Sequence, residues 1–257
     1  MRFSTAIVRV PGLSYADGLT TSAEGRADID RACVQHADYR NALRACGVEV
    51  ITLSADERFP DGTFVEDTAV IAERVAILTR PGAPSRAGEV PTVMAALRQF
   101  RPALEQIEPP GTVDGGDICQ AGEHFFIGIS ARSNQAGAAQ LAGILARHGY
   151  SASMIDIRAH RTLLHLKSGI TYLGERRFMI ARDAPRPAEL EAYELIEVDA
   201  AESYAANGIR VNNFVLVAAG FPRLAARLDE FGYAVRCLEV SEFRKMDGGL
   251  SCLSLRF

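Results

Sequence analysis

The sequence predicts an α/β fold in which five ββαβ units surround a central site. Four segments repeat one pattern, in which a polar start leads into an apolar strand, a tight polar turn and a second apolar strand. Amphipathic helix patterns and short third strands alternate with these hairpins. Matching positions recur at intervals of 50, 51, 40 and 44 residues, at Asp67, Asp117, Ser168, Gly208 and Cys252.

The repeated hairpins begin at four polar or small positions, which are Glu66, Gly116, Lys167 and Asn207. Their turns read AER, AGEH, GERR and VNN, and they carry the Gly, Asn and charged residues that short connections favour. A fifth hairpin forms if the last strand, LSCLSLRF, pairs with FSTAIVRV near the amino end. The two ends of the sequence would then close the units into a ring.

Helices are expected between the hairpins, where apolar residues recur every three or four positions. The clear patterns cover residues 28–47, 91–104, 134–149 and 221–232, and a weaker one covers residues 185–195. Third strands are expected over residues 48–53, 150–157, 193–198 and 233–240. Because all units share one spacing, we predict a single domain over residues 1–257 rather than two domains.

Composition points to a globular protein with a small-molecule ligand. Of the 257 residues, 48% are hydrophobic and 23% are charged, and the net charge of −4 gives no support to nucleic-acid binding. Residues 1–30 contain no secretory apolar run, and eighteen apolar residues never follow one another, so no membrane partner is expected. These features predict a cytoplasmic protein. They are compatible with a homodimer and leave the oligomeric state open.

The starts of the five units are expected to converge near the pseudo-symmetry axis, where they bring reactive side chains together. They supply Glu66, Asp67, Asp114, Asp117, His165, Lys167, Ser168, Asn207 and Cys252. Cys252 lies in an apolar segment that resembles a buried strand and follows two glycines. A cysteine in such a strand is usually part of the core, but the ring-closing position favours a nucleophile.

Five cysteines are spread along the chain without a C-x-x-C pair or a histidine at metal-ligand spacing. Neither a disulfide framework nor a metal site is expected. The charged pair Glu66 and Asp67 is set into an apolar segment, where an unpaired charge would be costly. The position of this pair therefore favours a ligand over a solvated turn.

Seven motifs, in this order and spacing, carry a family resemblance: FPDGTFVEDTAV, LTRPGAPSR, TVDGGDI, SARSNQAG, LLHLKSG, SYAAN and MDGGLSC. Together they resemble the dimethylarginine dimethylaminohydrolase family of the guanidine-modifying, or pentein, superfamily. The resemblance spans nearly the whole chain and implies a five-bladed α/β propeller. It also implies hydrolysis of N-methylated L-arginines to L-citrulline and methylamine or dimethylamine through a covalent cysteine thiouronium. No metal or organic cofactor is implied.

The resemblance also implies roles for single residues. Cys252 becomes the nucleophile, His165 the acid and base, and Asp114 the acid that orients His165. The implied substrate-binding residues are Leu19, Asp61, Glu66, Asp67, Arg86, Arg132 and Met246. Among them, Arg86 and Arg132 would hold the substrate carboxylate. Asp61 and the backbone of Leu19 would hold its α-ammonium group, under a mobile loop over residues 14–22.

Two other readings share parts of this pattern. Arginine deiminases and amidinotransferases use the same cysteine, histidine and acids, but they are generally longer chains. A non-catalytic ribosome anti-association factor has the same five-bladed architecture, but it has no use for Cys252, His165 and Asp114 together.

The chain departs from some family members at Gly208, where they carry cysteine. Negative charge near Cys252 further predicts a raised thiol pKa and a protonated resting enzyme.

Overall fold

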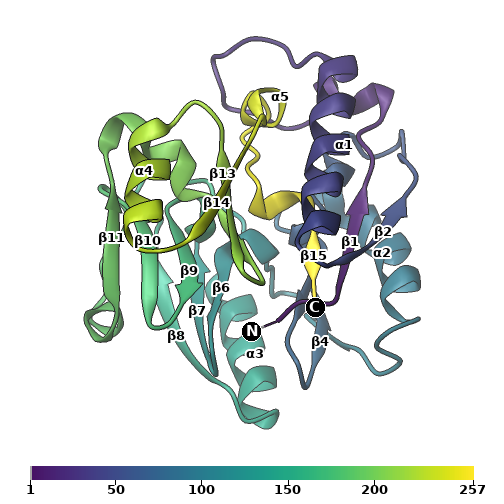
Figure 1. Ribbon diagram of the computed structural model, residues 1–257. Coiled ribbons are helices and arrows are strands. Elements are labelled where there is room, and N and C mark those ends of the chain that lie inside the picture. The colour runs from purple at the N-terminus through teal and green to yellow at the C-terminus, as the bar shows by residue number, and fades with distance from the viewer. Residues whose placement is uncertain (1) are drawn as a thin grey trace.

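The structure is a computed structural model that describes residues 2–257 and contains five three-stranded sheets (Figure 1). In every sheet the middle strand pairs antiparallel with one neighbour and parallel with the other. This is the pairing that a ββαβ unit produces, because a hairpin is antiparallel and a crossover connection is parallel. The five-unit α/β propeller predicted from the repeats is therefore confirmed.

The strands of each sheet have the following bounds, given in order of pairing. The first sheet contains β3 (Ala69–Ile71), β4 (Ala76–Leu78) and β5 (Glu105–Gln106). The second contains β6 (Ile118–Ala121), β7 (His124–Ile129) and β8 (Ser151–Asp156), and the third contains β9 (Ile170–Gly174), β10 (Arg177–Ala181) and β11 (Glu194–Val198). The fourth contains β12 (Ile209–Val211), β13 (Phe214–Ala218) and β14 (Ala234–Leu238), and the fifth contains β15 (Leu255–Arg256), β1 (Thr5–Arg9) and β2 (Glu49–Leu53).

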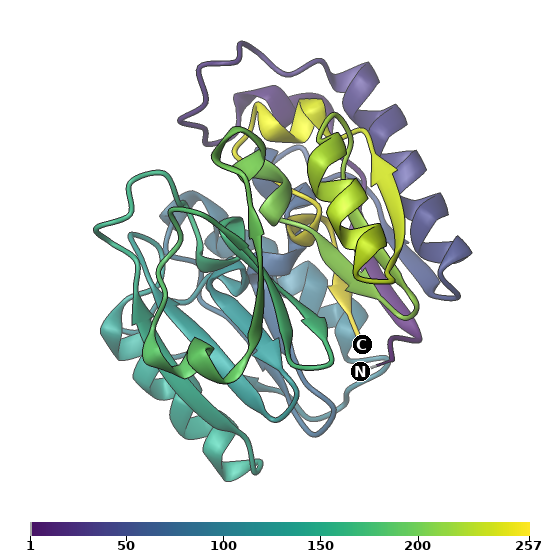
Figure 2. The same cartoon turned by 60° about the vertical axis from the view of Figure 1, so that its left-hand side comes forward.

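The fifth sheet joins the two ends of the described chain. Ile7 in β1 is opposite Leu255 in β15, and the backbone N–H of Phe257 donates to the carbonyl of Thr5 at 2.9 Å. Both views of the ribbon show the N and C labels close together beside this sheet (Figures 1 and 2). The ring closure expected from the sequence is confirmed.

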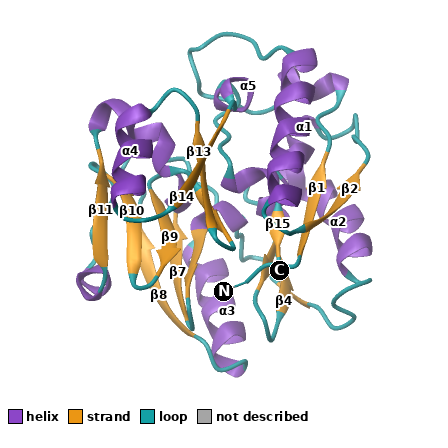
Figure 3. Ribbon diagram, viewed as in Figure 1, coloured by secondary structure: helices purple, strands orange, loops and turns teal. Residues whose placement is uncertain are grey.

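The α-helices lie outside the sheets and are shorter than their sequence patterns (Figure 3). They are α1 (Ile29–Ala45), α2 (Val90–Leu97), α3 (Gln135–Arg147), α4 (Pro222–Glu230) and α5 (Ser241–Arg244). The side chains of Asp28 and Asn134 accept backbone N–H groups at the starts of α1 and α3, which is the usual way to satisfy a helix start. No helix over residues 2–257 is both long and apolar enough to cross a membrane.

Two expectations about helices were wrong. The pattern over residues 91–104 ends as a helix at Leu97, and the chain then reaches strand β5, which the sequence did not reveal. The weak pattern over residues 185–195 forms only a 3₁₀ turn at Ala188–Ala192 before β11. Pro187 immediately precedes this turn, and proline disfavours a helical residue before it and offers no N–H group.

The starts of the units are 3₁₀ turns rather than strands, which corrects a further expectation. These turns are Val65–Thr68, Gly115–Asp117, Leu166–Ser168, Ala200–Ala206 and Ser251–Leu253. Glu66, Asp67 and Cys252 therefore lie in turns just before a first strand. The physical reason is that polar side chains here bond to backbone groups of the neighbouring unit: Asp67 accepts the N–H of Gly116, and Asn207 accepts that of Ser251.

Candidate active site

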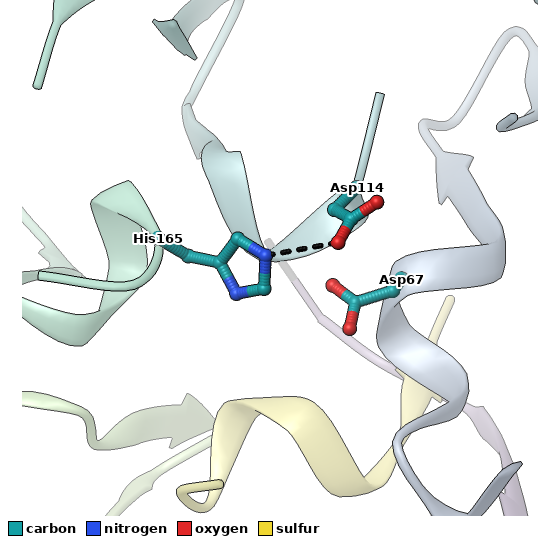
Figure 4. A group of neighbouring side chains, drawn as sticks. All are labelled: Asp67, Asp114 and His165. Carbon is teal, nitrogen blue, oxygen red and sulfur yellow. Dashed lines mark hydrogen bonds and ion pairs between the residues drawn. The ribbon is translucent and has the colours of Figure 1, made fainter. Parts of the chain in front are cut away.

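The turns at the starts of the units bring Asp67, Asp114, His165 and Cys252 to the centre of the ring. All four side chains are buried, and Cys252 retains 9% exposure. Figure 4 shows His165 and Asp114 in contact, with Asp67 beside them and the turn that contains Cys252 below. The structure thus gathers residues that are up to 185 positions apart in the sequence.

His165 is held by Asp114. The Nε2 atom of His165 lies 3.0 Å from Oδ2 of Asp114, and the other oxygen of Asp114 accepts the N–H of Gly82 at 2.8 Å. Gly116 is needed beneath the ring, because a Cβ atom there would lie 2.6 Å from Nδ1 of His165. The imidazole is therefore fixed in one orientation, as a proton-transfer group requires.

The surroundings of His165 favour its charged form. Burial alone would lower the pKa of the imidazole, but Asp67, Asp117 and Asp114 outweigh burial and raise that pKa to about 9. At neutral pH the ring is an imidazolium that can donate a proton to a leaving amine. It becomes a base once it has given that proton away.

Asp67 remains ionised in the same environment. Its Oδ1 accepts the N–H of Gly116 at 2.8 Å, and its Oδ2 lies 2.5 Å from Nη1 of Arg86. Burial would raise the pKa of this carboxyl, but the charges of His165 and Arg86 lower it to about 2. Asp67 is thus a carboxylate directed at the centre of the site.

Arg86 lies beneath this carboxylate as a buried partner of acids. Besides Asp67, its guanidinium donates to both oxygens of Glu89, at 3.0 and 2.8 Å, and to the carbonyl of Phe64 at 2.9 Å. Burial would lower the pKa of Arg86, but Asp67 and Glu89 raise it well above its ordinary value. The role expected from the resemblance would require Arg86 to exchange one of these partners for a substrate carboxylate.

Arg132 occupies a different setting. It is half-buried, and none of the ion pairs over residues 2–257 includes its guanidinium. Its positive charge is near enough to Asp61 to lower the pKa of that carboxyl, although burial raises it overall. Arg132 therefore offers a guanidinium that can take a ligand without breaking an existing pair.

The loop before α1 reaches the site at Asp61. Oδ1 of Asp61 accepts the N–H of Leu19 at 3.0 Å, and a Cβ atom on Gly18 would lie 2.6 Å from the same oxygen and 3.3 Å from Cε of Met246. Met246 is buried, whereas Leu19 is 42% exposed. The sequence-predicted residues Leu19, Asp61 and Met246 are therefore one cluster, packed through Gly18.

Glu66 lies between Lys167 and the segment that carries Cys252. Its Oε1 lies 2.5 Å from Nζ of Lys167, and its Oε2 accepts from Oγ of Ser251 at 2.8 Å. Ser251 Oγ in turn lies 4.0 Å from Sγ of Cys252. Glu66, Lys167 and Ser251 also line a cavity of about 410 Å³. Glu66 thus adds a carboxylate to the surroundings of the thiol while itself being paired.

The thiol of Cys252 is a much weaker acid than an ordinary cysteine thiol. Burial, and then the charges of Glu66 and Asp67, raise the pKa of its thiol to about 12. The direction agrees with the raised pKa expected from the sequence. The resting thiol is protonated, and a cation placed between the carboxylates would favour the thiolate.

Asp67, Asp114 and His165 present three potential ligand atoms within 4.8 Å of one another, which raises the question of a metal ion. The surroundings fit a cation of this kind poorly. A metal ligand must be a neutral imidazole, but the carboxylates keep His165 protonated, and Arg86 already neutralises Asp67.

Sequence reasoning gave no role to several residues that complete the site. Glu89 fixes Arg86, Lys167 and Ser251 fix Glu66, and Asn207 fixes the backbone of Ser251 at 3.0 Å. Lys167, Ser168 and Asn207 were recognised as unit starts only. Their position in the repeat was the one available signal, because their partners lie in other units.

Comparison with known proteins extends the resemblance. Residues 63–213 match the family model described as arginine deiminase. The chain is 44% identical over 256 residues to the N(G),N(G)-dimethylarginine dimethylaminohydrolase of Pseudomonas aeruginosa, and the match covers 99% of this chain and 100% of that protein.

Two solved structures agree over nearly the whole length. A cysteine-to-serine mutant of the Pseudomonas aeruginosa enzyme in complex with citrulline has a TM-score of 0.96 at 43% identity and covers 100% of both chains. A histidine-to-glycine dimethylarginine dimethylaminohydrolase, bound as an adduct with S-methyl-L-thiocitrulline, has a TM-score of 0.95 at 44% identity, covering 99% of this chain and 100% of that one. This chain therefore belongs to the dimethylarginine dimethylaminohydrolase family.

Proposed function

We propose that this chain is an enzyme that hydrolyses mono- and asymmetrically dimethylated L-arginine to L-citrulline and methylamine or dimethylamine. The observation that carries the proposal is the buried thiol of Cys252 among carboxylates, beside an imidazolium held by Asp114. Such a site favours a ligand that is both cationic and electrophilic, and a guanidinium has both properties. The 44% identity to an enzyme of that name supports the same substrate class.

Substrate recognition follows from the charges around the site. The guanidinium lies between Asp67 and Asp114, whose oxygens accept its N–H groups in a plane. At the other end, Arg132 and Arg86 hold the carboxylate, while Asp61 and the backbone of Leu19 hold the α-ammonium group. Glu66 and Met246 shape the wall around the methylated nitrogen. Arg132 makes first contact, because its guanidinium is accessible and outside the ion pairs of the site.

The first half-reaction forms a covalent intermediate. The bound cation lowers the proton affinity of Cys252, the thiol proton passes to solvent, and the thiolate attacks the guanidinium carbon to form a C–S bond. The tetrahedral adduct collapses when the imidazolium of His165 gives its proton to the methylated nitrogen. The C–N bond breaks, methylamine or dimethylamine leaves, and a thiouronium remains on Cys252 with a neutral His165.

The second half-reaction restores the enzyme. Neutral His165 removes a proton from water, and the resulting oxygen nucleophile attacks the thiouronium carbon. The C–S bond then breaks, the electron pair returns to sulfur, the hydroxyl proton of the adduct returns to that sulfur and restores the thiol, and citrulline is released. His165 ends protonated as it began, so the proton lost to the amine has been replaced from water.

A product assay tests the proposal against its nearest alternative. The enzyme is incubated with asymmetric dimethylarginine or free arginine, and dimethylamine, ammonia and citrulline are measured. We expect citrulline with dimethylamine in equal amounts and far slower turnover of arginine. Preferential release of ammonia from arginine would instead identify a deiminase, and citrulline from neither substrate would overturn the proposal.

We further propose that residues 1–257 act as one catalytic domain in the cytoplasm. The site draws on turns from separate units, so no smaller part of the chain carries all of it. All five cysteines, which lie within the described residues, are free thiols, and a reducing compartment keeps them so.

A further inference from the structure

Asp117 is a fully buried carboxylate to which the mechanism above gives no part. Its Oδ1 accepts the backbone N–H of Leu166 at 3.0 Å. Its Oδ2 accepts the hydroxyls of Ser130, at 2.7 Å, and Ser133, at 2.6 Å. Burial raises the pKa of Asp117, whereas the charge of His165 and these three donors favour the ionised form, and without them a buried carboxylate would be strongly destabilising.

Each of these three donors leads directly to a residue of the site. Leu166 follows His165 in the chain, so its N–H fixes the backbone that carries the imidazole. Ser133 Oγ accepts the backbone N–H of Asp114 at 3.0 Å. Ser130 Oγ accepts the backbone N–H of Arg132 at 2.9 Å. One carboxylate therefore connects the backbones of Asp114, His165 and Arg132.

The surrounding backbone leaves little room for adjustment. A Cβ atom on Gly128 would lie 2.9 Å from Oδ1 of Asp117. A Cβ atom on Gly82, whose N–H binds Asp114, would lie 2.1 Å from the carbonyl oxygen of Arg132. The backbone is thus closely packed both at Asp117 and at the turn of Arg132. A change in the hydrogen bonds of Asp117 would therefore displace the site residues.

We propose that Asp117 is a positioning residue that aligns His165 with Asp114 and holds the turn that carries Arg132. Its catalytic consequences rest on the proposed function. Its effect on His165 does not, because the charge of Asp117 acts on the imidazole whatever the substrate is.

The electrostatic part concerns every charged group that faces His165. Asp67, Asp114 and Asp117 all raise the pKa of the imidazole, and Asp67 is itself paired with Arg86. Loss of the charge of Asp117 leaves two carboxylates against the same burial. The pKa of His165 should therefore fall from about 9, and the imidazolium should lose its proton at lower pH.

The first experiment measures this titration without using activity. Asp117→Asn keeps the shape of the side chain and removes its charge, and Asp229→Asn on the exposed face of α4 is the matched control. The His165 ring is followed by NMR with histidine labelled at the ring nitrogens. We expect the midpoint to move to lower pH in Asp117→Asn alone. A folded Asp117→Asn protein with the wild-type midpoint would overturn the electrostatic role.

The second experiment separates the two serine branches and keeps Asp117 in place. Ser133→Ala loosens Asp114 and should lower kcat about tenfold with little change in KM. Ser130→Ala loosens the turn of Arg132 and should raise KM for methylarginine several-fold with little change in kcat. Both changes should shift the His165 titration less than Asp117→Asn does, because the charge of Asp117 remains. If both variants retain wild-type kcat and KM, or both lose them equally, the positioning role is wrong.

These readouts also separate this inference from the proposed function. If dimethylarginine is not a substrate, the titration shift in Asp117→Asn is still expected, and the serine variants are then assayed on whichever substrate the product assay identifies. Should Asp117→Asn fail to fold, the serine variants alone decide, because each removes only one hydroxyl.

Discussion

Oγ of Ser251 donates to Oε2 of Glu66 at 2.8 Å. Because Ser251 directly precedes Cys252 in the chain, this bond brings a carboxylate close to the thiol. Lys167 contacts the other oxygen of Glu66, so this buried carboxylate is paired with a cation. A nucleophile is ordinarily activated by positive surroundings. Here the surroundings are negative, and activation has to come with the ligand.

The assignment of the nucleophile predicts the outcome of Cys252→Ser. The substitution should leave citrulline formation below about 1% of wild type, because a serine hydroxyl in these negative surroundings cannot ionise. Tm should hardly change, since the volume removed is small. Cys237→Ser, at an exposed position, is the control and should keep full activity. Appreciable turnover by Cys252→Ser would exclude a thiouronium intermediate.

Substrate-assisted activation predicts different pH profiles for two alkylating reagents. A pKa of about 12 for Cys252 means that a neutral reagent such as iodoacetamide reacts slowly at pH 7 and accelerates only as pH rises beyond the ordinary thiol range. A cationic chloroacetamidine should lie between the carboxylates, favour the thiolate and inactivate at neutral pH. Rates are corrected for reaction with a free thiol. Two parallel profiles would mean that Cys252 is activated before any ligand binds.

Neutralising Glu66 should make the resting thiol more reactive. Glu66→Gln removes one of the two charges that raise the pKa of Cys252 and leaves Lys167 without its partner, so the thiol pKa should fall. Iodoacetamide should then inactivate this variant several-fold faster than wild type at pH 8. Glu230→Gln, exposed at the end of α4, serves as the control. An unchanged rate would show that burial alone suppresses the thiol.

The two arginines should respond differently to truncation. Arg86→Ala leaves Asp67 and Glu89 buried without their partner, which typically costs about 3 to 5 kcal/mol in unfolding free energy. Arg132→Ala breaks no ion pair of the described residues and should leave the free energy of unfolding nearly unchanged.

Kinetics of the arginine variants complete this test. Arg132→Ala should raise KM for methylarginine but hardly affect the slow reaction of a small amidine that lacks a carboxylate. Denaturant unfolding and both kinetic assays are run on the same preparations. A stable Arg86→Ala protein would show that Asp67 and Glu89 do not need this partner, and an Arg132→Ala protein that loses both substrates equally would contradict a contact with the substrate carboxylate.

The sequence was sufficient for the ring but not for the turns at its centre. Strand period and turn residues revealed the hairpins, and the repeat showed that β15 and β1 must pair. The 3₁₀ turns of three and four residues that contain Cys252 and Glu66 have no period of their own, so the sequence predicts strands there. Strand β5 was missed for the same reason, since Glu105–Gln106 is only two residues long.

The candidate site shows a similar division. The spacing of the repeats was enough to expect Asp67, Asp114 and His165 at one place, because equivalent positions meet at an axis. The partner of Arg86 could not be foreseen in the same way. Whether its guanidinium is free or bound to Asp67 and Glu89 depends on the path of the backbone around it, which no local pattern encodes.

The pairing of β1 with β15 also determines when the site can exist during synthesis. The strand at Thr5–Arg9 is made about 250 residues before its antiparallel partner at Leu255–Arg256. At the usual rates of about 5 to 20 residues per second, β1 waits on the order of ten seconds or more for that partner. A ribosome-bound chain therefore contains the acids and the imidazole before the thiol of Cys252 has been added. The fifth sheet and the complete cluster of Asp67, Asp114, His165 and Cys252 can form only after the other four units have been made.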